Sequence, residues 1–499
     1  MAFLLGIDIG TSSTKTVLMD WEGTPLSLSQ EEYSFDIPRE GWAEQDAEVW
    51  WGAVCHTTKD ALRKAGVPAS HLDGIGFSGQ MHGLVPLDSR GKPLRKAIIW
   101  CDQRSIAQVE KIHSFLGAEK FGAVTCNPIA TGFQLASLLW MKENEPGLYA
   151  RIRHVLLPKD YVRYRMTGHL STDITDASGT LALDVPQGRW AQEILRELGL
   201  NAEFYPSIFV PDEEAGVVTS NAARAAGLKT GISVFHGGAD QVMQAIGNGI
   251  IAPGQVSVTI GTGAQVFSPI ASPFYDKALR SHTFNNRDGW YFMGAALAGG
   301  LSLKWLRDKI FPAGTSYQDM IGLAEKVPPG SEGLVFLPYL AGERTPHMNP
   351  YARGMFFGLQ LNHSAGHLVR AVMEGVVFSL KDCLSVFYEL GQECKHVVAS
   401  GGGARSALWL QIQADILGRP VYTSQMTEQA SVGAAITAGV GAGVYADYLQ
   451  ACSTVIRWND QPYLPIRENA GAYEEYYRLF QDLYTANKDS MYRLSSVRR

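Results

Sequence analysis

Short hydrophobic segments recur along this chain, and several of them end in clusters of glycine and small polar residues. Segments of this length and composition predict buried strands, and the second half of the chain repeats the pattern of the first. Elsewhere, apolar residues three or four positions apart predict amphipathic helices. Strands and helices mixed in this way predict an α/β fold. The expected strands are residues 4–9, 16–19, 72–78, 85–88, 98–100, 233–235, 256–260, 266–268 and 396–399, and the expected helices are 48–64, 135–142, 241–247, 300–309, 368–387 and 472–487.

Three other segments carry distinct expectations. Residues 430–443 form a helix of small residues that could pack very closely against a neighbour. The final helix, 472–487, has a wide stripe of aromatic residues and leucine, which predicts that it covers one part of the fold. Residues 161–183 are rich in threonine, aspartate, serine and glycine, so we expect them to form an exposed edge.

Two glycine-threonine turns follow strands about half a chain apart. The first begins at Gly10-Thr11 and the second at Gly261-Thr262. Backbone N–H groups in such turns can hold phosphate without a bulky side chain. Either turn alone could be an ordinary hairpin turn, but together they predict two similar lobes that grip one polyphosphate in a cleft. A Pro-Gly turn at 251–254 places the boundary between domains 1–250 and 251–499.

Composition narrows the possible partners. The chain has 499 residues and a net charge of -6, which argues against nucleic acid as the main partner. No apolar stretch approaches the roughly 20 residues that span a bilayer, so we expect no membrane association. The first apolar segment is interrupted early by Asp8 and predicts a strand instead of a signal peptide. The six cysteines are scattered, as expected for reduced thiols in a cytoplasmic protein.

Two aspartates are candidates for the chemistry. Asp240 follows a strand and three small residues and precedes a helix, where a carboxylate could accept a proton from a hydroxyl that attacks phosphorus. The alternative is an ordinary helix N-cap. Asp8 could organise Mg²⁺ through water or simply satisfy turn amides. Thr11, Ser12, Ser13 and Lys15 would line the phosphate tail, although Lys15 could equally be a solvated hairpin lysine.

A second turn suits a small polyol. Gln80, Met81 and His82 combine an amide, a thioether and an imidazole between two glycines. Trp42 could form a further wall of that pocket, while a structural histidine and a core tryptophan are the alternatives. Three consecutive glycines at 401–403 would let a flat purine lie against the backbone. The chain has neither a P-loop motif nor a convincing dinucleotide-binding fingerprint.

Taken together, these motifs resemble the FGGY carbohydrate kinases of the actin/Hsp70/hexokinase-like superfamily. The resemblance covers nearly the whole chain in order and implies two ribonuclease H-like lobes around an ATP and sugar cleft. The Gln-Met-His-Gly turn resembles most the members that phosphorylate D-xylulose to D-xylulose 5-phosphate. The segments that carry the resemblance are residues 6–11, 41–46, 79–83, 157–161, 237–240, 337–346 and 401–406.

The resemblance implies a role for each candidate. Asp240 is the general base, and Asp8 supports the site of magnesium and phosphate. ATP and Mg²⁺ are the implied cofactors. The implied sugar contacts are Gln80, Met81, His82, Asp240, Gln241 and Trp42, and the implied nucleotide contacts are Thr11, Ser12, Ser13, Lys15, Gly261, Thr262, Gly300, Gly402 and Gly403.

Three positions depart from the family pattern: Ser137 where a lysine is usual, Gln241 where some members have asparagine, and Cys101 in place of a frequent asparagine. The last two could change which pentulose fits. A kinase for another ketose or polyol is therefore the nearest alternative, and a non-catalytic nucleotide or sugar sensor is a more distant one. Relatives are often dimers, so a homodimer is possible.

Overall fold

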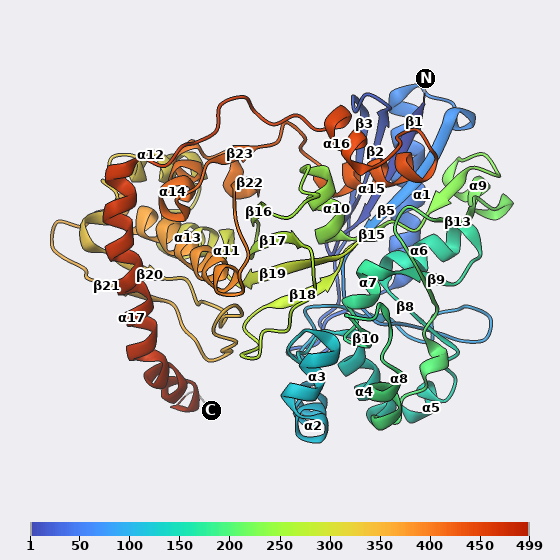
Figure 1. Ribbon diagram of the computed structural model, residues 1–499, viewed down its shortest axis with the longest axis horizontal. Coiled ribbons are helices and arrows are strands. Elements are labelled where there is room, and N and C mark those ends of the chain that lie inside the picture. The colour runs from blue at the N-terminus through green and yellow to red at the C-terminus, as the bar shows by residue number, and fades with distance from the viewer. Residues whose placement is uncertain (1, 498–499) are drawn as a thin grey trace.

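Two mixed β-sheets with helices packed around them make up the two halves of this computed structural model, which describes residues 2–497 (Figure 1). The first sheet has seven strands in the order β13-β14-β5-β1-β2-β3, with β15 paired to β5. The second has six strands in the order β18-β19-β17-β16-β22-β23. The strands are β1 (Phe3–Ile9), β2 (Ser13–Asp20), β3 (Pro25–Glu32), β5 (Leu72–Gly79), β13 (Glu214–Val217), β14 (Ser233–Phe235), β15 (Gly238–Ala239), β16 (Gln255–Ile260), β17 (Ala264–Ile270), β18 (His282–Asn285), β19 (Trp290–Ala296), β22 (His396–Gly401) and β23 (Val421–Thr423).

The two sheets share one local arrangement. In the first, β1 pairs antiparallel with β2 and parallel with β5. In the second, β16 pairs antiparallel with β17 and parallel with β22. The two glycine-threonine turns therefore connect equivalent hairpins, and β5 and β22 both end in glycine-rich turns. Seven of the expected strands lie in these two sheets and are confirmed. Of the other two, 85–88 corresponds to β6 (Val85–Leu87) and is confirmed, whereas 98–100 is wrong beyond Ile98, where β7 (Ala97–Ile98) ends.

The helices expected from the spacing of apolar residues are also confirmed. They correspond to α1, α4, α10, α11, α13 and α17. The helices of the first half are α1 (Ala47–Ala65), α2 (Ile106–Leu116), α3 (Ala118–Thr125), α4 (Gln134–Asn144), α5 (Pro146–Tyr149), α6 (Pro158–Thr167), α7 (Ile174–Ser178), α8 (Gln192–Glu197), α9 (Ser220–Ala226) and α10 (Asp240–Gly247); those of the second half are α11 (Gly300–Ile310), α12 (Tyr317–Ala324), α13 (Ala365–Glu389), α14 (Ala407–Leu417), α15 (Gln429–Gly441), α16 (Tyr448–Val455) and α17 (Arg467–Val497).

Helix α15 lies against the first sheet although it belongs to the second half of the sequence, as the orange ribbon beside the blue strands shows (Figure 1). Glycines make this contact possible. A Cβ on Gly76 of β5 would lie 1.9 Å from the backbone oxygen of Ala434, and one on Gly433 would lie 1.8 Å from that of Met243 in α10. The expectation that this small-residue helix packs closely is confirmed. The division at residue 250 stays a prediction.

The expectation that residues 161–183 form an exposed edge is wrong. Arg163, Asp173 and Asp176 have no exposed side-chain surface. They lie in or beside α6, β9 (Ser171–Asp173) and α7, where ion pairs compensate their charges and Asp173 caps α7, although several of their buried polar atoms lack a hydrogen-bond partner among residues 2–497. Polar composition predicts a solvated segment, but charged side chains that pair with one another can be buried.

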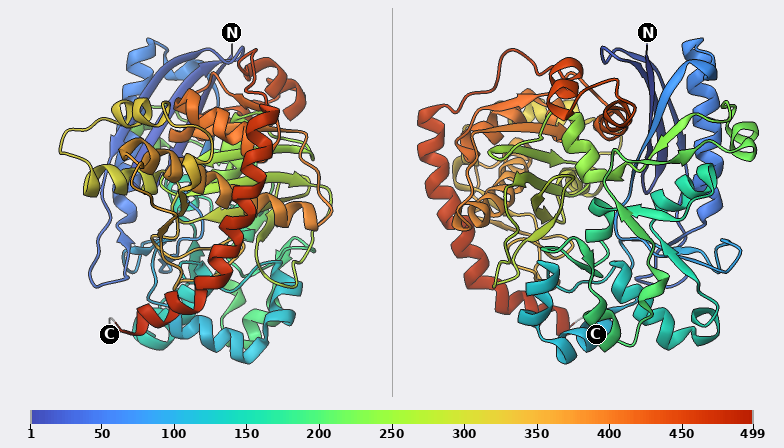
Figure 2. Two further views of the ribbon diagram at one scale, coloured as in Figure 1. Left: turned by 90° about the vertical axis from the view of Figure 1, so that its left-hand side faces the viewer. Right: turned by 45° about the vertical axis from the view of Figure 1, so that its right-hand side comes forward.

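Helix α17 runs along the outside of the second half (Figure 2). Its aromatic stripe packs inward, because Tyr473 and Phe480 are 0% exposed and Tyr484 is 9% exposed. The expectation that this helix covers part of the fold is therefore confirmed. Tyr473 also donates a hydrogen bond of 2.6 Å to the buried carboxylate of Glu374 in α13.

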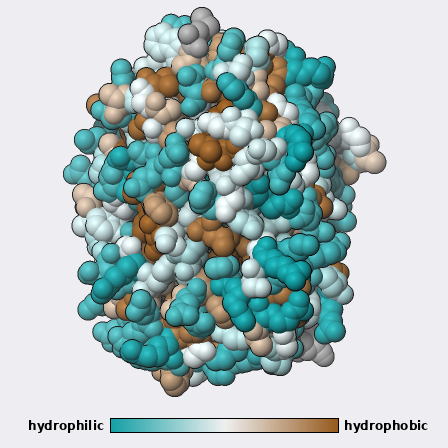
Figure 3. Space-filling view, turned by 90° about the vertical axis from the view of Figure 1, so that its right-hand side faces the viewer, coloured by the Kyte–Doolittle hydropathy of each residue, from teal (hydrophilic) through white to brown (hydrophobic). Residues whose placement is uncertain are grey.

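Within residues 2–497, ten short strands form two-stranded pairs outside the main sheets. Among the residues described, no helix is long and apolar enough to cross a membrane. The face shown in Figure 3 is mostly hydrophilic, with scattered hydrophobic residues. All six cysteines are free, as expected. The remaining strands are β4 (Glu44–Gln45), β6 (Val85–Leu87), β7 (Ala97–Ile98), β8 (His154–Leu156), β9 (Ser171–Asp173), β10 (Leu183–Asp184), β11 (Arg189–Trp190), β12 (Ser207–Phe209), β20 (Val335–Leu337) and β21 (Met355–Phe357).

Candidate active site

Three neighbouring strands bring Asp8 and Asp240 to one edge of the first sheet. Asp8 in β1 is opposite Ser78 in β5, and Ser78 is opposite Gly238 in β15. Strands are about 4.8 Å apart, so the end of β15 delivers Asp240 to the same edge as Asp8. Asp240 is the first residue of α10, which lies between the two halves (Figure 1). The Thr259 hydroxyl of the second sheet donates a hydrogen bond of 3.2 Å to Gln244 of this helix.

The Asp240 carboxyl group is in an unfavourable position for a charge. It is partly buried, and its Oδ1 atom has no hydrogen-bond partner among residues 2–497. Burial and the nearby charge of Asp8 raise the pKa of Asp240 to about 7, although hydrogen bonds from Gln241 lower it. A carboxylate that titrates near neutral pH is well suited to accept a proton from a substrate hydroxyl. Asp240 lies in the first turn of α10 and is not the N-cap residue of that helix, which is Ala239.

Asp8 is held by one of its neighbours in the sheet. The Ser78 hydroxyl donates a hydrogen bond of 2.7 Å to Asp8 Oδ1. Burial nevertheless raises the pKa of Asp8. Lys15, directly opposite Asp8 in β2, forms an ion pair of 2.7 Å with Glu428 just before α15. The structure thus ties the Lys15 ammonium to a carboxylate, and a contact between Lys15 and phosphate stays a prediction.

The first glycine-threonine turn is fixed by side chains from other segments. Gln45 Nε2 donates a hydrogen bond of 2.7 Å to the Thr11 carbonyl, and the Trp100 indole donates one of 2.8 Å to the Thr11 hydroxyl. Gln80 is 1% exposed, and its amide bonds to Gln45 and Thr11. Gln80 therefore supports the turn, while its predicted contact with sugar is untested. Ser12 is exposed at the tip of the turn and Ser13 is buried at the start of β2.

Met81 and His82 lie side by side after β5. Both are buried, at 5% and 7% exposure, and both contact the same backbone segment, because a Cβ on Gly179 would lie 3.1 Å from Met81 and 3.2 Å from His82. His82 Nδ1 forms a hydrogen bond of 2.6 Å to the Gly179 carbonyl. The φ angle of His82 is 71°, an uncommon conformation for a residue with a side chain. Such local strain is typical of functional sites.

The His82 ring is neutral at physiological pH. Burial lowers its pKa to about 3, and the positive charge of Arg344 contributes in the same direction. The ring packs 4.0 Å from that of Phe133 and 6.1 Å from that of Phe284 in β18 of the second half. The hydrogen bond from Nδ1 to the Gly179 carbonyl leaves Nε2 as the acceptor nitrogen of the neutral ring. An apolar wall beside one acceptor fits a sugar hydroxyl.

A pocket of about 710 Å³ lies in the second half and is lined by the five predicted nucleotide residues of that half, but not by Thr11, Ser12, Ser13 or Lys15. The chain approaches itself closely there, since a Cβ on Gly300 would lie 2.6 Å from the Gly261 carbonyl oxygen. Helix α12 supplies a wall that the sequence did not indicate, with Tyr317 and Ile321. Backbone turns beside an apolar wall fit a nucleotide. The predicted residues that line this pocket are Gly261, Thr262, Gly300, Gly402 and Gly403.

Trp42 is partly buried and belongs to an aromatic stack. Its ring lies 5.3 Å from that of Trp140, and the Arg104 guanidinium is 3.8 Å from its centre. The structure gives it this packing role, and a contact with sugar stays a prediction. Of the three positions that depart from the family pattern, Ser137 is buried in α4, Cys101 is partly buried, and Gln241 forms a hydrogen bond with Asp240.

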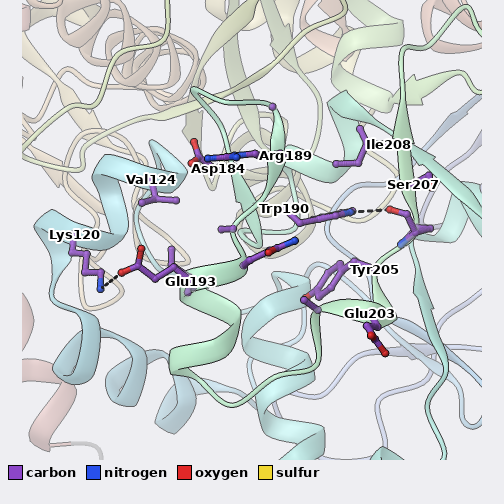
Figure 4. A pocket seen from close by; sticks show the side chains of 16 residues that line it. Lys120, Val124, Asp184, Arg189, Trp190, Glu193, Glu203, Tyr205, Ser207 and Ile208 are labelled. Carbon is purple, nitrogen blue, oxygen red and sulfur yellow. Dashed lines mark hydrogen bonds and ion pairs between the residues drawn. The ribbon is translucent and has the colours of Figure 1, made fainter.

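A second groove, of about 730 Å³, lies elsewhere in the first half between α3, α8 and β12 (Figure 4). It contains none of the predicted site residues. Its polar groups are partly paired with one another, since Lys120 lies 3.1 Å from Glu193 and the Trp190 indole donates to the Pro206 carbonyl. We assign the candidate active site to the sheet edge and the glycine-lined pocket.

Comparisons with known proteins agree with this class of site, a sugar kinase with an actin- or hexokinase-like fold. The N-terminal and C-terminal domain models of the FGGY family of carbohydrate kinases match residues 3–247 and 256–442. The xylulose kinase of Bacillus subtilis (strain 168) is 35% identical over 505 residues, covering 100% of both chains. The gluconokinase of that strain is 30% identical over 501 residues, covering 97% of this chain and 95% of its own. The crystal structure of ligand-bound xylulose kinase from Lactobacillus acidophilus has a TM-score of 0.94 at 26% identity, covering 99% of this chain and 100% of that chain.

The chain belongs to the FGGY family of carbohydrate kinases. It is therefore a sugar phosphotransferase that uses ATP with Mg²⁺. The expected family, fold class and cofactors are confirmed. The residues present fit Mg-ATP, because Asp8 offers a carboxylate for hydrated Mg²⁺ and the glycines of the pocket let backbone approach phosphate closely.

Proposed function

We propose that this chain phosphorylates D-xylulose to D-xylulose 5-phosphate, with Asp240 as the general base. The observation that carries the proposal is the Asp240 carboxyl group, with an unpaired Oδ1 and a pKa near 7 at the start of α10. The neighbouring Met81 and His82 turn is compact and its own side chains carry no positive charge at pH 7, which fits a neutral sugar. Several relatives named xylulose kinase support the same substrate.

In the proposed mechanism, Asp240 accepts the proton of the C5 hydroxyl group. The hydroxyl oxygen forms a bond to the γ-phosphorus while the bond from that phosphorus to the leaving ADP oxygen breaks. Bound Mg²⁺ would neutralise phosphate charge, and Asp8 would hold it through water. Met81 and His82 would orient the sugar, and the turns at Thr11 and Thr262 would hold the phosphates. Trp42, Gln80 and Gln241 would complete the sugar pocket, and Ser12, Ser13 and Lys15 would line the phosphate tail.

Gluconate is the second candidate, because a gluconokinase is 30% identical over nearly the whole chain. An acid would need a cation in the pocket, and Arg344 is the charged group that acts on His82. Another ketose or polyol would keep the same mechanism. A sensor without catalytic activity would bind ATP and sugar but release no ADP.

A coupled ADP-release assay separates these possibilities. The wild-type protein with Mg-ATP is tested on D-xylulose, D-ribulose, L-ribulose, L-xylulose, D-fructose, glycerol and gluconate. We expect kcat/KM for D-xylulose to exceed every other value at least tenfold. Higher activity on gluconate or another sugar would reject the proposed substrate and keep the family. ATP binding without turnover of any sugar would favour the sensor.

Two further proposals concern location and assembly, and the same preparation tests the second. We propose that the protein acts in the cytoplasm and forms a homodimer, as the expectations from sequence have it. Light scattering after size exclusion should give twice the chain mass of 54.5 kDa. A mass of one chain across micromolar concentrations would reject the dimer.

A further inference from the structure

A cluster of buried charges lies directly behind the candidate base, and the proposed function does not use it. It consists of Lys159, Asp160, Arg163, Asp173 and Asp176, all with side chains that are 0% exposed. Burial of charge costs free energy even when charges pair, so a cluster of this size is weak evidence for stability alone. Its neighbours suggest a role in positioning.

The Lys159 ammonium occupies the centre of this ion cluster. Its Nζ atom lies 2.7 Å from Asp160, 2.8 Å from Asp173 and 3.4 Å from Asp176. These three carboxylates are close enough together to hold a metal ion, but the lysine supplies the positive charge instead. The cluster also touches the sheet edge of the site, because a Cβ on Gly79 would lie 2.7 Å from Lys159 Cβ.

One chain of hydrogen bonds connects the cluster to the base. Asp173, held by Lys159, caps α7 and accepts a hydrogen bond from the Thr175 hydroxyl. With its proton committed to Asp173, the Thr175 oxygen accepts a hydrogen bond of 2.9 Å from the Ala239 N–H. Ala239 directly precedes Asp240. The buried ion pair of Lys159 and Asp173 thus orients the Thr175 hydroxyl group. The oxygen of that hydroxyl group in turn holds the Ala239 amide, next to the Asp240 carboxylate.

The same helix holds the sugar turn. The Gly179 carbonyl, at the end of α7, bonds to His82 Nδ1. On the other side, a Cβ on Gly238 would lie 2.7 Å from the Thr175 hydroxyl oxygen, so β15 passes Thr175 as closely as backbone can. Helix α7 is therefore in contact with Ala239, directly before the expected base, and with His82, the expected sugar ligand.

We propose that Thr175 is a positioning residue for phosphoryl transfer: its hydroxyl group, oriented by Asp173 of the ion cluster, fixes the Ala239 amide and thereby the Asp240 carboxylate relative to His82. This inference rests on the proposed role of Asp240. Misplacement of a reacting group by about 1 Å can cost about a hundredfold in rate. A single hydrogen bond behind Asp240 can therefore control turnover without contact with substrate.

Thr175→Val tests this with little change of shape, because it removes the hydroxyl group and keeps the branched side chain. Thr175→Ser keeps the hydroxyl group and serves as the rescue variant. Thr58→Val is the matched control, since Thr58 is also 0% exposed and its hydroxyl has no partner within the described part of the chain. Each variant is checked for Mg-ATP binding and for thermal unfolding before kinetics.

We expect Thr175→Val to lower kcat by about ten- to a hundredfold while KM for ATP changes less than twofold. Thr175→Ser should recover kcat to within about threefold of wild type, and Thr58→Val should not change it. Hydrogen exchange gives a readout independent of activity: the Ala239 amide should exchange at least about tenfold faster in Thr175→Val only, because its acceptor is lost.

Three results would overturn the inference: a kcat of Thr175→Val within twofold of wild type, equal losses in Thr175→Val and Thr175→Ser, or unchanged exchange at Ala239. Failure of the proposed function has a different signature. In that case wild type phosphorylates no sugar of the panel, or Asp240→Asn keeps wild-type turnover. An inactive Asp240→Asn together with a fully active Thr175→Val would reject the positioning role alone.

Discussion

Replacement of Asp240 by asparagine should slow the reaction strongly and at the same time stabilise the fold above neutral pH. Asparagine keeps the shape of the side chain and removes its charge. Burial and the charge of Asp8 raise the pKa of Asp240 from 3.8 to about 7, so the folded state disfavours the ionised carboxylate. The unfolded chain has no such preference. Above pH 7 the wild-type fold therefore contains a penalty that the asparagine variant lacks.

The sign of the pH dependence follows from this pKa. Below pH 4, Asp240 is protonated in both the folded and the unfolded chain, and its raised pKa makes no charge penalty. As pH rises to 7, the unfolded chain loses its proton first, so the wild type loses stability over this window. A pKa rise from 3.8 to about 7 corresponds to about 4 kcal/mol at most. Because the side chain is only partly buried, water screens the charge, and we expect about 1–2 kcal/mol.

Thermal unfolding at pH 5 and at pH 8, without magnesium or nucleotide, measures the effect. Asp240→Asn should unfold about 1–4 °C above wild type at pH 8, with a smaller difference at pH 5. Asp460→Asn, at an exposed carboxylate, is the control and should shift neither value. In parallel, kcat of Asp240→Asn should fall by about 10²–10⁴. Equal stability changes at both pH values would refute the electrostatic reasoning, and near-native turnover would refute the base.

Three further predictions test other parts of the site. His82→Ala should raise KM for the sugar at least about tenfold and leave KM for ATP within twofold. Because the pKa of His82 in the wild type is about 3, the effect should be the same at pH 6 and pH 8. Parallel changes in both KM values would contradict the sugar contact. Gly433→Ala places a Cβ 1.8 Å from a backbone oxygen and should cost at least about 3 kcal/mol of unfolding free energy. Gly52→Ala, in an open position of α1, is the control and should gain about 0.5–1 kcal/mol. Denaturation curves that do not separate the two variants would reject the packing argument. Gly300→Ala should weaken Mg-ATP binding at least about tenfold in a fluorescent-nucleotide titration, with Gly471→Ala on the exposed face of α17 as the control that should match wild type.

Much of the local structure could be predicted from the sequence, because periodicity and turn chemistry are local signals. Residues 4–9 contain no polar side chain except that of Asp8, and they lie in β1. The five predicted nucleotide residues of the second half line one pocket, since glycine turns after strands must face a ligand or another backbone. The role of each of these residues still rests on experiment.

The rest depends on contacts between distant segments. Polar composition predicts that residues 161–183 are solvated, yet their charges pair with one another in the interior. The partner of Lys15 is Glu428, 413 positions away, and nothing local indicates it. Tyr317 and Ile321 line the nucleotide pocket from α12, a helix whose capping box marks its start but not its function. The hydrophobic pattern predicts which face of a segment is buried, but it does not predict which other segment covers that face.

Helix α10 shows why these distant contacts matter for catalysis. Its first residue is the expected base, and Thr175 holds the peptide just before it. Along its length, Gly433 and Gly247 allow α15 to approach within backbone contact, and Gln244 bonds to the second sheet. The helix is thus fixed at its start, along one face and towards the other half of the molecule. A reacting carboxylate must be held to within a fraction of an ångström, and support from several directions achieves this better than one local cap. The sequence marks the carboxylate, whereas its placement comes from residues up to 193 positions away, between Asp240 and Gly433.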